Sequence, residues 1–340
     1  MAPVANRTVL AVVEHDRGTV APTTFEALTV ARTVSDRVDA LTIGATADAI
    51  AGDLAAYGVA SVHQVHDDVL TDYGPEAWGE VVAHAVRALA PDVVMASGTD
   101  RGNEVLAQAA ARLDLPFAAN CTELRTGGGD GGGGGDRDGD GDGVEVTRIR
   151  WGGSLLEDAT LPGGVTIVTI APHAVEAGPA ATPGAAEPVP FTVRLDRSLG
   201  RSVVRGRVER EAGVTLATAP VVVGGGRGVG SAEAFAPLEE LAAELGGVVG
   251  CSRAVTNNGW RNHADQVGQT GTRIAPEVYF ACGISGAIQH WVGAMASKHI
   301  IAVNTDRQAN IVTRAGYAVI GDLHEVVPAI TAEIRRRRTD

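Results

Sequence analysis

Short apolar, β-branched runs alternate with segments of helical spacing along most of this chain of 340 residues. RTVLAVVEH (7–15) precedes the helical pattern of 24–36, and PDVVMASG (91–98) precedes that of 100–115. The alternation returns in the second half, where APVVVGGGRG precedes the helical pattern of 231–246. Such alternation is typical of parallel sheets covered by helices on both faces. The sequence therefore predicts an α/β protein with two domains, each a mostly parallel sheet flanked by helices, since one core rarely serves a chain this long.

A proline- and alanine-rich segment, EAGPAATPGAAEPVP (176–190), separates the two halves and is expected to connect the domains. We expect an N-terminal α/β domain over 1–190 that serves as scaffold and partner surface. A C-terminal, Rossmann-like nucleotide-binding domain is expected over 200–330. LHEVVPAITAEIRRRR (323–338) is expected to form a closing helix that ends in four arginines, so residues 331–340 are expected to be a basic tail in solvent.

The segment 127–143 contains eleven glycines and five aspartates, so it cannot form a core and is expected to be a disordered insertion. Its D-x-D-G-D pattern resembles a calcium loop, but an EF-hand loop needs a glutamate at its twelfth position. Counted from Asp136 or Asp138, that position holds Thr147 or Ile149. No metal site is therefore predicted.

Composition excludes several classes of function. The formal net charge of −13 argues against a nucleic-acid-binding face. No apolar stretch approaches the roughly 20 residues of a membrane span, so the chain is not expected to be membrane-embedded. The three cysteines, Cys121, Cys251 and Cys282, form no C-x-x-C pair, which favours a reducing compartment, here taken as the cytoplasm.

Glycine and small polar residues follow almost every strand expected in the second half. In an open parallel sheet the carboxyl ends of the strands form one crevice, so these residues are expected to meet there. GISGA (283–287) stands between a strand and a helix, where free backbone N–H groups can bind phosphates. The expected ligand is therefore a nucleotide. The residues concerned are Gly224 to Gly230, Ser252, Arg253, Gly283 to Gly286, Asn304 and Asp322.

The common nucleotide fingerprints are absent, and other functions stay open. GGGRGVG (224–230) is not G-x-G-x-x-G because Val229 occupies the third glycine position, and there is no P-loop motif. One alternative is a serine hydrolase, since GISGA approaches the G-x-S-x-G elbow with Ser285 as nucleophile and His290 or His324 as base. A second alternative is a non-redox nucleotide-binding module that uses the same crevice.

Two motifs resemble one family closely. QVGQTGTR (266–273) and CGISGAIQH (282–290), at this spacing, are similar to the FAD-binding domain of the electron transfer flavoprotein alpha subunit family, and the resemblance extends over about 221–330. SGTDRGNEVLAQAAARLDLPFAANCTEL (97–124) resembles the first domain of that family. The resemblance implies an FAD-binding C-terminal domain.

The resemblance also implies which residues bind FAD. His290 would lie near the flavin O2, Thr270 near N5 or O4, and Arg253, beside Ser252, against the isoalloxazine ring. Arg227 would meet a phosphate. The remaining positions are Val267, Gly268 and Gln269 along the ribityl chain, Ser285, Gly286, Ala287, Ile288 and Gln289 from the pyrophosphate towards the ring, and Asn304, Asp322 and Leu323 at the adenosine end.

The function that the resemblance implies is electron transfer by a carrier that is not a self-sufficient enzyme. This FAD-binding alpha subunit would pair with a beta subunit, which in turn would hold AMP or a second flavin. The heterodimer would carry electrons from dehydrogenases, such as the acyl-CoA dehydrogenases of fatty acid oxidation, to a membrane quinone oxidoreductase. A donor beside N1 and O2 would stabilise the negatively charged, one-electron-reduced ring by roughly 1.5–3 kcal/mol, or roughly 65–130 mV.

Overall fold

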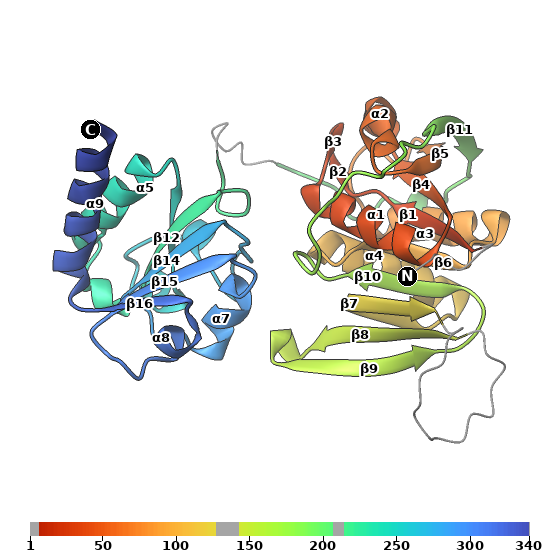
Figure 1. Ribbon diagram of the computed structural model, residues 1–340. Coiled ribbons are helices and arrows are strands. Elements are labelled where there is room, and N and C mark those ends of the chain that lie inside the picture. The colour runs from red at the N-terminus through yellow and green to blue at the C-terminus, as the bar shows by residue number, and fades with distance from the viewer. Residues whose placement is uncertain (1–6, 127–142, 207–213, 340) are drawn as a thin grey trace, which may run out of the picture. The chain divides into compact units, whose positions relative to one another are not determined.

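The chain forms two compact units (Figure 1). The first unit continues past residue 190, the end expected for the N-terminal domain. All but the last residue of the glycine- and aspartate-rich insertion lies outside the described residues. The computed structural model describes residues 7–126, 143–206 and 214–339. The units are Met1–Arg150 with Leu155–Val208, and Trp151–Ser154 with Glu209–Asp340.

A nine-stranded sheet forms the centre of the first unit. From β11 to β7 all neighbouring strands are parallel, whereas β7, β8 and β9 form an antiparallel meander at the other edge. A short hairpin, β2 (His15–Asp16) and β3 (Thr19–Val20), follows the first strand. In spatial order the strands of the sheet are β11 (Glu187–Thr192), β5 (Val59–His66), β4 (Arg37–Ile43), β1 (Thr8–Val12), β6 (Val93–Ser97), β10 (Thr166–Ile170), β7 (Phe117–Thr126), β8 (Val144–Arg150) and β9 (Leu155–Leu161).

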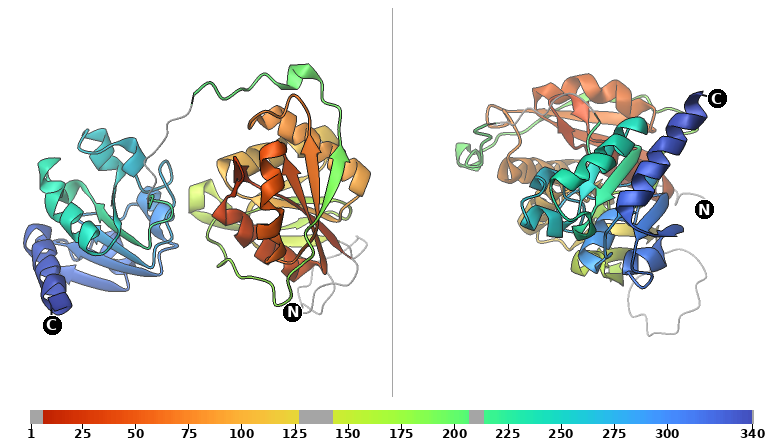
Figure 2. Two further views of the ribbon diagram at one scale, coloured as in Figure 1. Left: turned by 90° about the horizontal axis from the view of Figure 1, so that it is seen from above. Right: turned by 90° about the vertical axis from the view of Figure 1, so that its left-hand side faces the viewer.

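Helices cover both faces of this sheet (Figure 2). Leu28 of α1 and Leu54 of α2 pack in one cluster with Val9 of β1, and Leu106 of α4 packs in the opposite cluster with Leu10 of the same strand. Strands buried on both faces are almost continuously apolar, which explains the unbroken β-branched runs in the sequence. The helices are α1 (Pro22–Val34), α2 (Ala51–Ala55), α3 (Pro75–Leu89) and α4 (Asp100–Leu113).

Strand β11 corrects the expected connector, because Glu187 to Pro190 belong to the sheet and not to a linker. The strand pairs in parallel with β5 at the edge of the sheet. Pro188 and Pro190 lack an N–H. Because residues two apart direct their N–H groups to the same side of a strand, both missing donors fall on one side. An edge strand tolerates this loss on its outer side, so prolines do not exclude a strand here.

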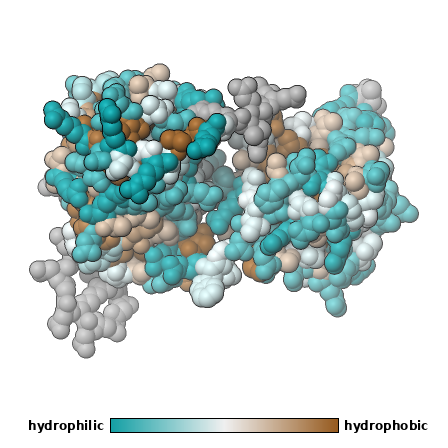
Figure 3. Space-filling view, turned by 180° about the vertical axis from the view of Figure 1, so that it is seen from behind, coloured by the Kyte–Doolittle hydropathy of each residue, from teal (hydrophilic) through white to brown (hydrophobic). Residues whose placement is uncertain are grey.

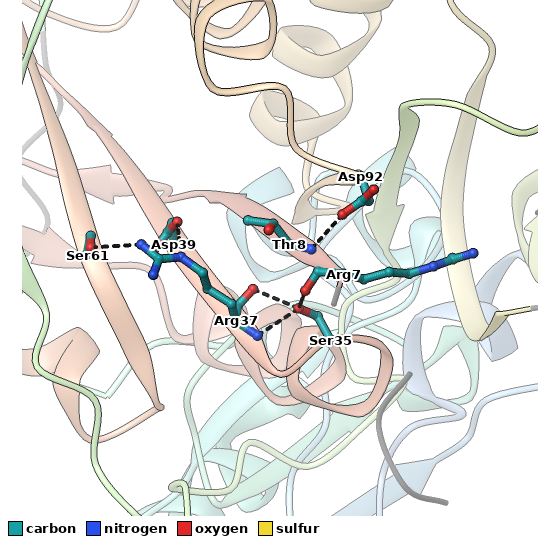
Figure 4. A network of polar contacts seen from close by, with 7 residues as sticks. All are labelled: Arg7, Thr8, Ser35, Arg37, Asp39, Ser61 and Asp92. Atoms are coloured by element: carbon teal, nitrogen blue, oxygen red, sulfur yellow. Dashed lines mark hydrogen bonds and ion pairs between the residues drawn. The ribbon is translucent and has the colours of Figure 1, made fainter. Parts of the chain in front are cut away.

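A polar network closes the amino-terminal edge of the same sheet (Figure 4). The backbone N–H of Thr8 donates to Asp92 Oδ2 (2.7 Å), which ties the start of β1 to the segment before β6. The Ser35 hydroxyl donates to the Arg37 carbonyl (2.7 Å), and Arg37 Nε donates to Asp39 Oδ2 (3.0 Å). These bonds satisfy polar groups at the strand starts, where no chemistry is predicted.

The second unit is built on a five-stranded sheet in which every pair is parallel. Numbered along the chain, its order is 2-1-3-4-5, an order of the doubly wound class in which ligands bind where the order reverses. The strands are β13 (Val248–Cys251), β12 (Val221–Gly225), β14 (Val278–Cys282), β15 (His299–Asn304) and β16 (Tyr317–Ile320), in spatial order (Figure 1). The expected parallel sheet with flanking helices is confirmed.

Helices again lie on both faces. Leu238 of α5 and Val327 of α9 pack on one face of the sheet, and Ala294 of α7 and Ile311 of α8 on the other. The four arginines lie near the end of α9, as expected for a closing helix, and Arg335 pairs with Glu244 of α5 (2.6 Å). The helices are α5 (Ala236–Glu244), α6 (Arg253–Asn257), α7 (Ile288–Ala294), α8 (Asn310–Arg314) and α9 (Leu323–Thr339).

Hydrophilic residues cover most of the visible face of each unit (Figure 3). Within the described ranges, no helix combines the length and apolarity that crossing a bilayer requires. Those ranges also hold no group of three or more histidine, cysteine, aspartate or glutamate side chains that could bind a metal ion.

Candidate cofactor site

Hydrogen bonds join the carboxyl ends of the five strands of the second unit into one row. The N–H of Ser252, after β13, donates to the Gly225 carbonyl (3.0 Å), and the N–H of Gly226, after β12, donates to the Cys282 carbonyl (2.8 Å). Asn304 Nδ2, at the end of β15, donates to the Ile284 carbonyl (2.8 Å), and the N–H of Gly321, after β16, donates to the Asn304 carbonyl (3.1 Å). The predicted convergence of polar strand ends is therefore present within this unit.

The loops after β12 and β14 cross at backbone contact distance. The N–H of Gly228 donates to the Gly283 carbonyl (3.0 Å). A Cβ on Gly226 would overlap the Gly283 carbonyl and come within 2.7 Å of the Ile284 Cα. Only glycine fits this crossing, which lies between the neighbouring strands where the strand order reverses. Glycine at these positions thus permits the loops around the crevice to pack closely.

The VGQT turn is fixed against the start of α7. The N–H of Gln269 donates to the Gln289 carbonyl (2.7 Å), and Gly268 has a φ of 143°, which strongly favours glycine. A Cβ on Gly268 would lie 2.7 Å from the Gln289 carbonyl oxygen. The two motifs of the sequence are thus one structural element. Val267 is buried beneath it, whereas the side chains of Gln269 and Gln289 are exposed.

His290 lies buried at the first turn of α7. Its Nε2 is 2.8 Å from the Tyr279 hydroxyl, and its Nδ1 is buried without a hydrogen-bond partner among the described residues. Burial disfavours the charged ring and lowers the pKa of His290 from 6.5 to about 4, although the Val267 backbone offsets part of this effect. The ring is therefore neutral near pH 7, and Nδ1, although the Val267 backbone lies near the ring, has no partner at hydrogen-bond geometry among the described residues.

This lowered pKa predicts acid sensitivity. Between about pH 6.5 and pH 4 the unfolded chain binds a proton at His290 that the folded chain does not, so stability falls as the pH falls through this window. Acidification from about pH 7.5 to pH 5 should cost the unit about 2 kcal/mol of unfolding free energy at this residue. Urea unfolding at both pH values should show this loss in the unsubstituted protein and a smaller loss in His290→Ala. An equal loss of unfolding free energy in both proteins would contradict the assignment of this acid sensitivity to His290.

Thr270 presents its hydroxyl at the surface of the VGQT turn. Gln266, buried at the end of the preceding segment, donates from Nε2 to the Thr270 hydroxyl oxygen (3.0 Å). Its Oε1 accepts a hydrogen bond from the Thr256 hydroxyl (2.7 Å). Because the Thr270 oxygen already accepts a hydrogen bond, its own proton is available to a ligand.

The two predicted arginines lie at strand ends, where their positive charge would suit an anionic ligand. Arg227 follows β12 and Arg253 begins α6; both are exposed. In the described part of the chain neither forms an ion pair, so their charge is not neutralised by a neighbouring carboxylate. Ser252 precedes Arg253 and is half-buried.

The residues predicted for the adenosine end lie after β15 and β16. Asn304 is half-buried and Asp322 is exposed, with its Oδ1 accepting from the His324 N–H (2.9 Å). Leu323 is buried, and its Cδ2 fills the space beside Gly283. All three therefore belong to the same edge of the sheet as the VGQT turn.

The geometry disfavours a hydrolase. Ser285 is exposed, but no histidine of the described segments forms a hydrogen bond with its hydroxyl. His290 bonds through Nε2 to Tyr279 and not to Ser285, whereas a nucleophile needs its base within hydrogen-bond reach.

Sequence reasoning missed two residues behind the site, Tyr279 and Gln266. Tyr279 lies in an apolar strand and resembles ordinary core, and Gln266 begins the recognised motif QVGQTGTR but was given no role. A buried polar side chain needs a partner, so a tyrosine within the expected strand 276–283 was the available signal.

Fold and site together define an open α/β domain that binds a nucleotide cofactor where its strand order reverses. A family model described as the electron transfer flavoprotein FAD-binding domain matches residues 215–295, and one described as the electron transfer flavoprotein domain matches 9–194. The chain belongs to the electron transfer flavoprotein alpha subunit family.

Full-length relatives agree. The chain is 34% identical to electron transfer flavoprotein subunit alpha of Bacillus subtilis over 317 residues, covering 92% of this chain and 93% of the relative. It is 36% identical to the subunit of that name in Mycobacterium tuberculosis, covering 97% and 99%. Protein FixB of Bradyrhizobium diazoefficiens is 35% identical, with 96% and 88% covered.

The residues present fit FAD. The buried Nδ1 of His290 lacks a partner, the Thr270 proton is available, and the glycine crossing brings backbone close to any phosphate bound there. Arg227 and Arg253 are exposed and form no ion pair among the described residues, so Arg227 would be available to a phosphate and Arg253 to the ring.

Proposed function

We propose that this chain is the FAD-binding alpha subunit of a heterodimeric electron carrier. The observation that carries the proposal is the row of hydrogen-bonded strand ends that brings Thr270, His290 and Ser285 to one edge of a parallel sheet. Bound FAD would supply the electron chemistry. The protein would bind the cofactor, orient it and set its reduction potential.

The chain's residues divide that work along the cofactor. His290 would donate a hydrogen bond beside O2 of the ring, and Thr270 would donate near N5 or O4. Arg253 would lie against the ring, and Arg227 would meet a phosphate. The other proposed contacts come from Ser252, Val267, Gly268, Gln269, Ser285, Gly286, Ala287, Ile288, Gln289, Asn304, Asp322 and Leu323.

The partner would be an electron transfer flavoprotein beta subunit. Dehydrogenases, such as acyl-CoA dehydrogenases, would donate electrons to the heterodimer, and a membrane quinone oxidoreductase would accept them. The relatives are named as subunits of electron transfer flavoproteins, which supports the pairing. The three cysteines are free and buried, which supports a reducing, cytoplasmic location.

Purification with a co-expressed beta subunit tests the proposal. The complex should be yellow, release FAD on denaturation, and lose and regain flavin absorbance on reduction by dithionite and reoxidation. A colourless complex that releases no flavin would reject it. Binding of adenine nucleotides in preference to FAD, without reversible reduction, would instead identify a non-redox nucleotide-binding module. Fluorophosphonate labelling lost in Ser285→Ala would identify a hydrolase.

A further inference from the structure

Tyr279 and His290 form an isolated buried pair. Tyr279 is 0% exposed, and His290 is its hydrogen-bond partner among the residues that the structure describes. The neighbouring strand leaves room for the hydroxyl, since a Cβ on Gly224 would lie 2.8 Å from the Tyr279 Cζ and overlap the hydroxyl itself. The tyrosine hydroxyl is therefore held in one place and directed at one atom of the histidine.

The proton in this hydrogen bond can lie on either partner. If Nε2–H donates to the tyrosine oxygen, the hydroxyl proton has no acceptor and Nδ1 becomes an unmatched acceptor. If the hydroxyl donates to Nε2, the tyrosine is satisfied and the unmatched group is a single Nδ1–H. Each buried unmatched group costs about 1–3 kcal/mol, so the second arrangement is favoured by about that amount.

We propose that Tyr279 is a positioning residue: its hydroxyl donates to Nε2 of His290, and thereby fixes the histidine as a neutral Nδ1–H donor to the flavin. The identification of the flavin as the acceptor rests on the proposed function. The tautomer of His290 does not depend on it. Burial supports it, because it keeps Tyr279 un-ionised by raising its pKa well above 10 and lowers the pKa of His290 to about 4. His290 thus acts on the ring as a dipole, without a formal charge.

The tautomer can be measured directly in the FAD-loaded complex with its beta subunit. Nitrogen chemical shifts of ¹⁵N-histidine-labelled protein distinguish protonated from unprotonated ring nitrogens, and the His290 signals are those lost in His290→Ala. We expect Nδ1 protonated and Nε2 unprotonated. In Tyr279→Phe the Nε2–H form should appear. A protonated Nε2 in the unsubstituted protein would overturn the proposal. This measurement does not depend on whether a Tyr279 variant folds.

A double-mutant cycle tests the consequence for the cofactor. Tyr279→Phe should lower the one-electron equilibrium constant for flavin reduction about tenfold, or about 59 mV, and should have no further effect in the His290→Ala background. Tyr317→Phe, an exposed tyrosine in β16 of the same sheet, is the matched control and should change nothing. An effect of Tyr279→Phe that persists without His290 would refute the positioning role. A complex without FAD would refute the proposed function, while the nitrogen shifts would still decide the tautomer.

Discussion

Replacement of His290 by alanine should leave FAD bound and lower the first one-electron reduction potential of the flavin by roughly 65–130 mV. A hydrogen bond to a charged group contributes about 1.5–3 kcal/mol, and the reduced ring bears negative charge whereas the oxidised ring does not. His290 is neutral, so the effect arises from the loss of a donor. Spectroelectrochemical titration of the FAD-loaded heterodimer measures this potential.

His299→Ala is the control for this prediction. His299 is an exposed histidine at the start of β15, at the opposite end of the strands from the cofactor site. Its replacement should leave the potential unchanged. If His290→Ala gave the same potential as the unsubstituted complex, His290 would not act on the reduced ring.

Gly226→Ala should abolish most FAD binding and lower the melting temperature of the second unit. The added Cβ would overlap the Gly283 carbonyl and lie 2.7 Å from the Ile284 Cα, so both backbone loops would have to move. Overpacking of this kind costs about 3 kcal/mol, or roughly 10 °C in melting temperature for a unit of this size. Calorimetry of the complex and the FAD released per alpha chain measure the two effects.

Gly316→Ala is the matched control in the same unit. The nearest atom to a Cβ there is the Ile300 carbonyl oxygen at 3.9 Å, which is an ordinary contact. This variant should retain full FAD content and melting temperature. Normal FAD content in Gly226→Ala would show that the crossing of the two loops is not needed for the site.

Periodicity predicted most of the fold, because strands buried on both faces must be apolar throughout and helices against them must be amphipathic. It failed at β11, where Pro188 and Pro190 resemble a linker and only pairing with β5 reveals an edge strand. The 2-1-3-4-5 order of the second unit was also beyond it, since strand order depends on contacts far apart in the sequence.

The site was also predicted only in part, because it too depends on contacts that form only when the chain folds. Resemblance located the VGQT turn and the run from Ser285 to His290, and the structure shows how the N–H of Gln269 joins them. Tyr279 and Gln266 escaped prediction because their side-chain partners, 11 and 4 residues away, become neighbours only through packing of strand, turn and helix. The roles of the predicted residues towards FAD stay predictions.

An experimental structure of the heterodimer with FAD tests the central claim most directly. The claim predicts the flavin at the carboxyl ends of β12 to β16, with its ring between Thr270 and His290 and its pyrophosphate beside Ser285. A flavin bound in the N-terminal unit, or His290 turned away from the ring with Nδ1 bonded elsewhere, would contradict it.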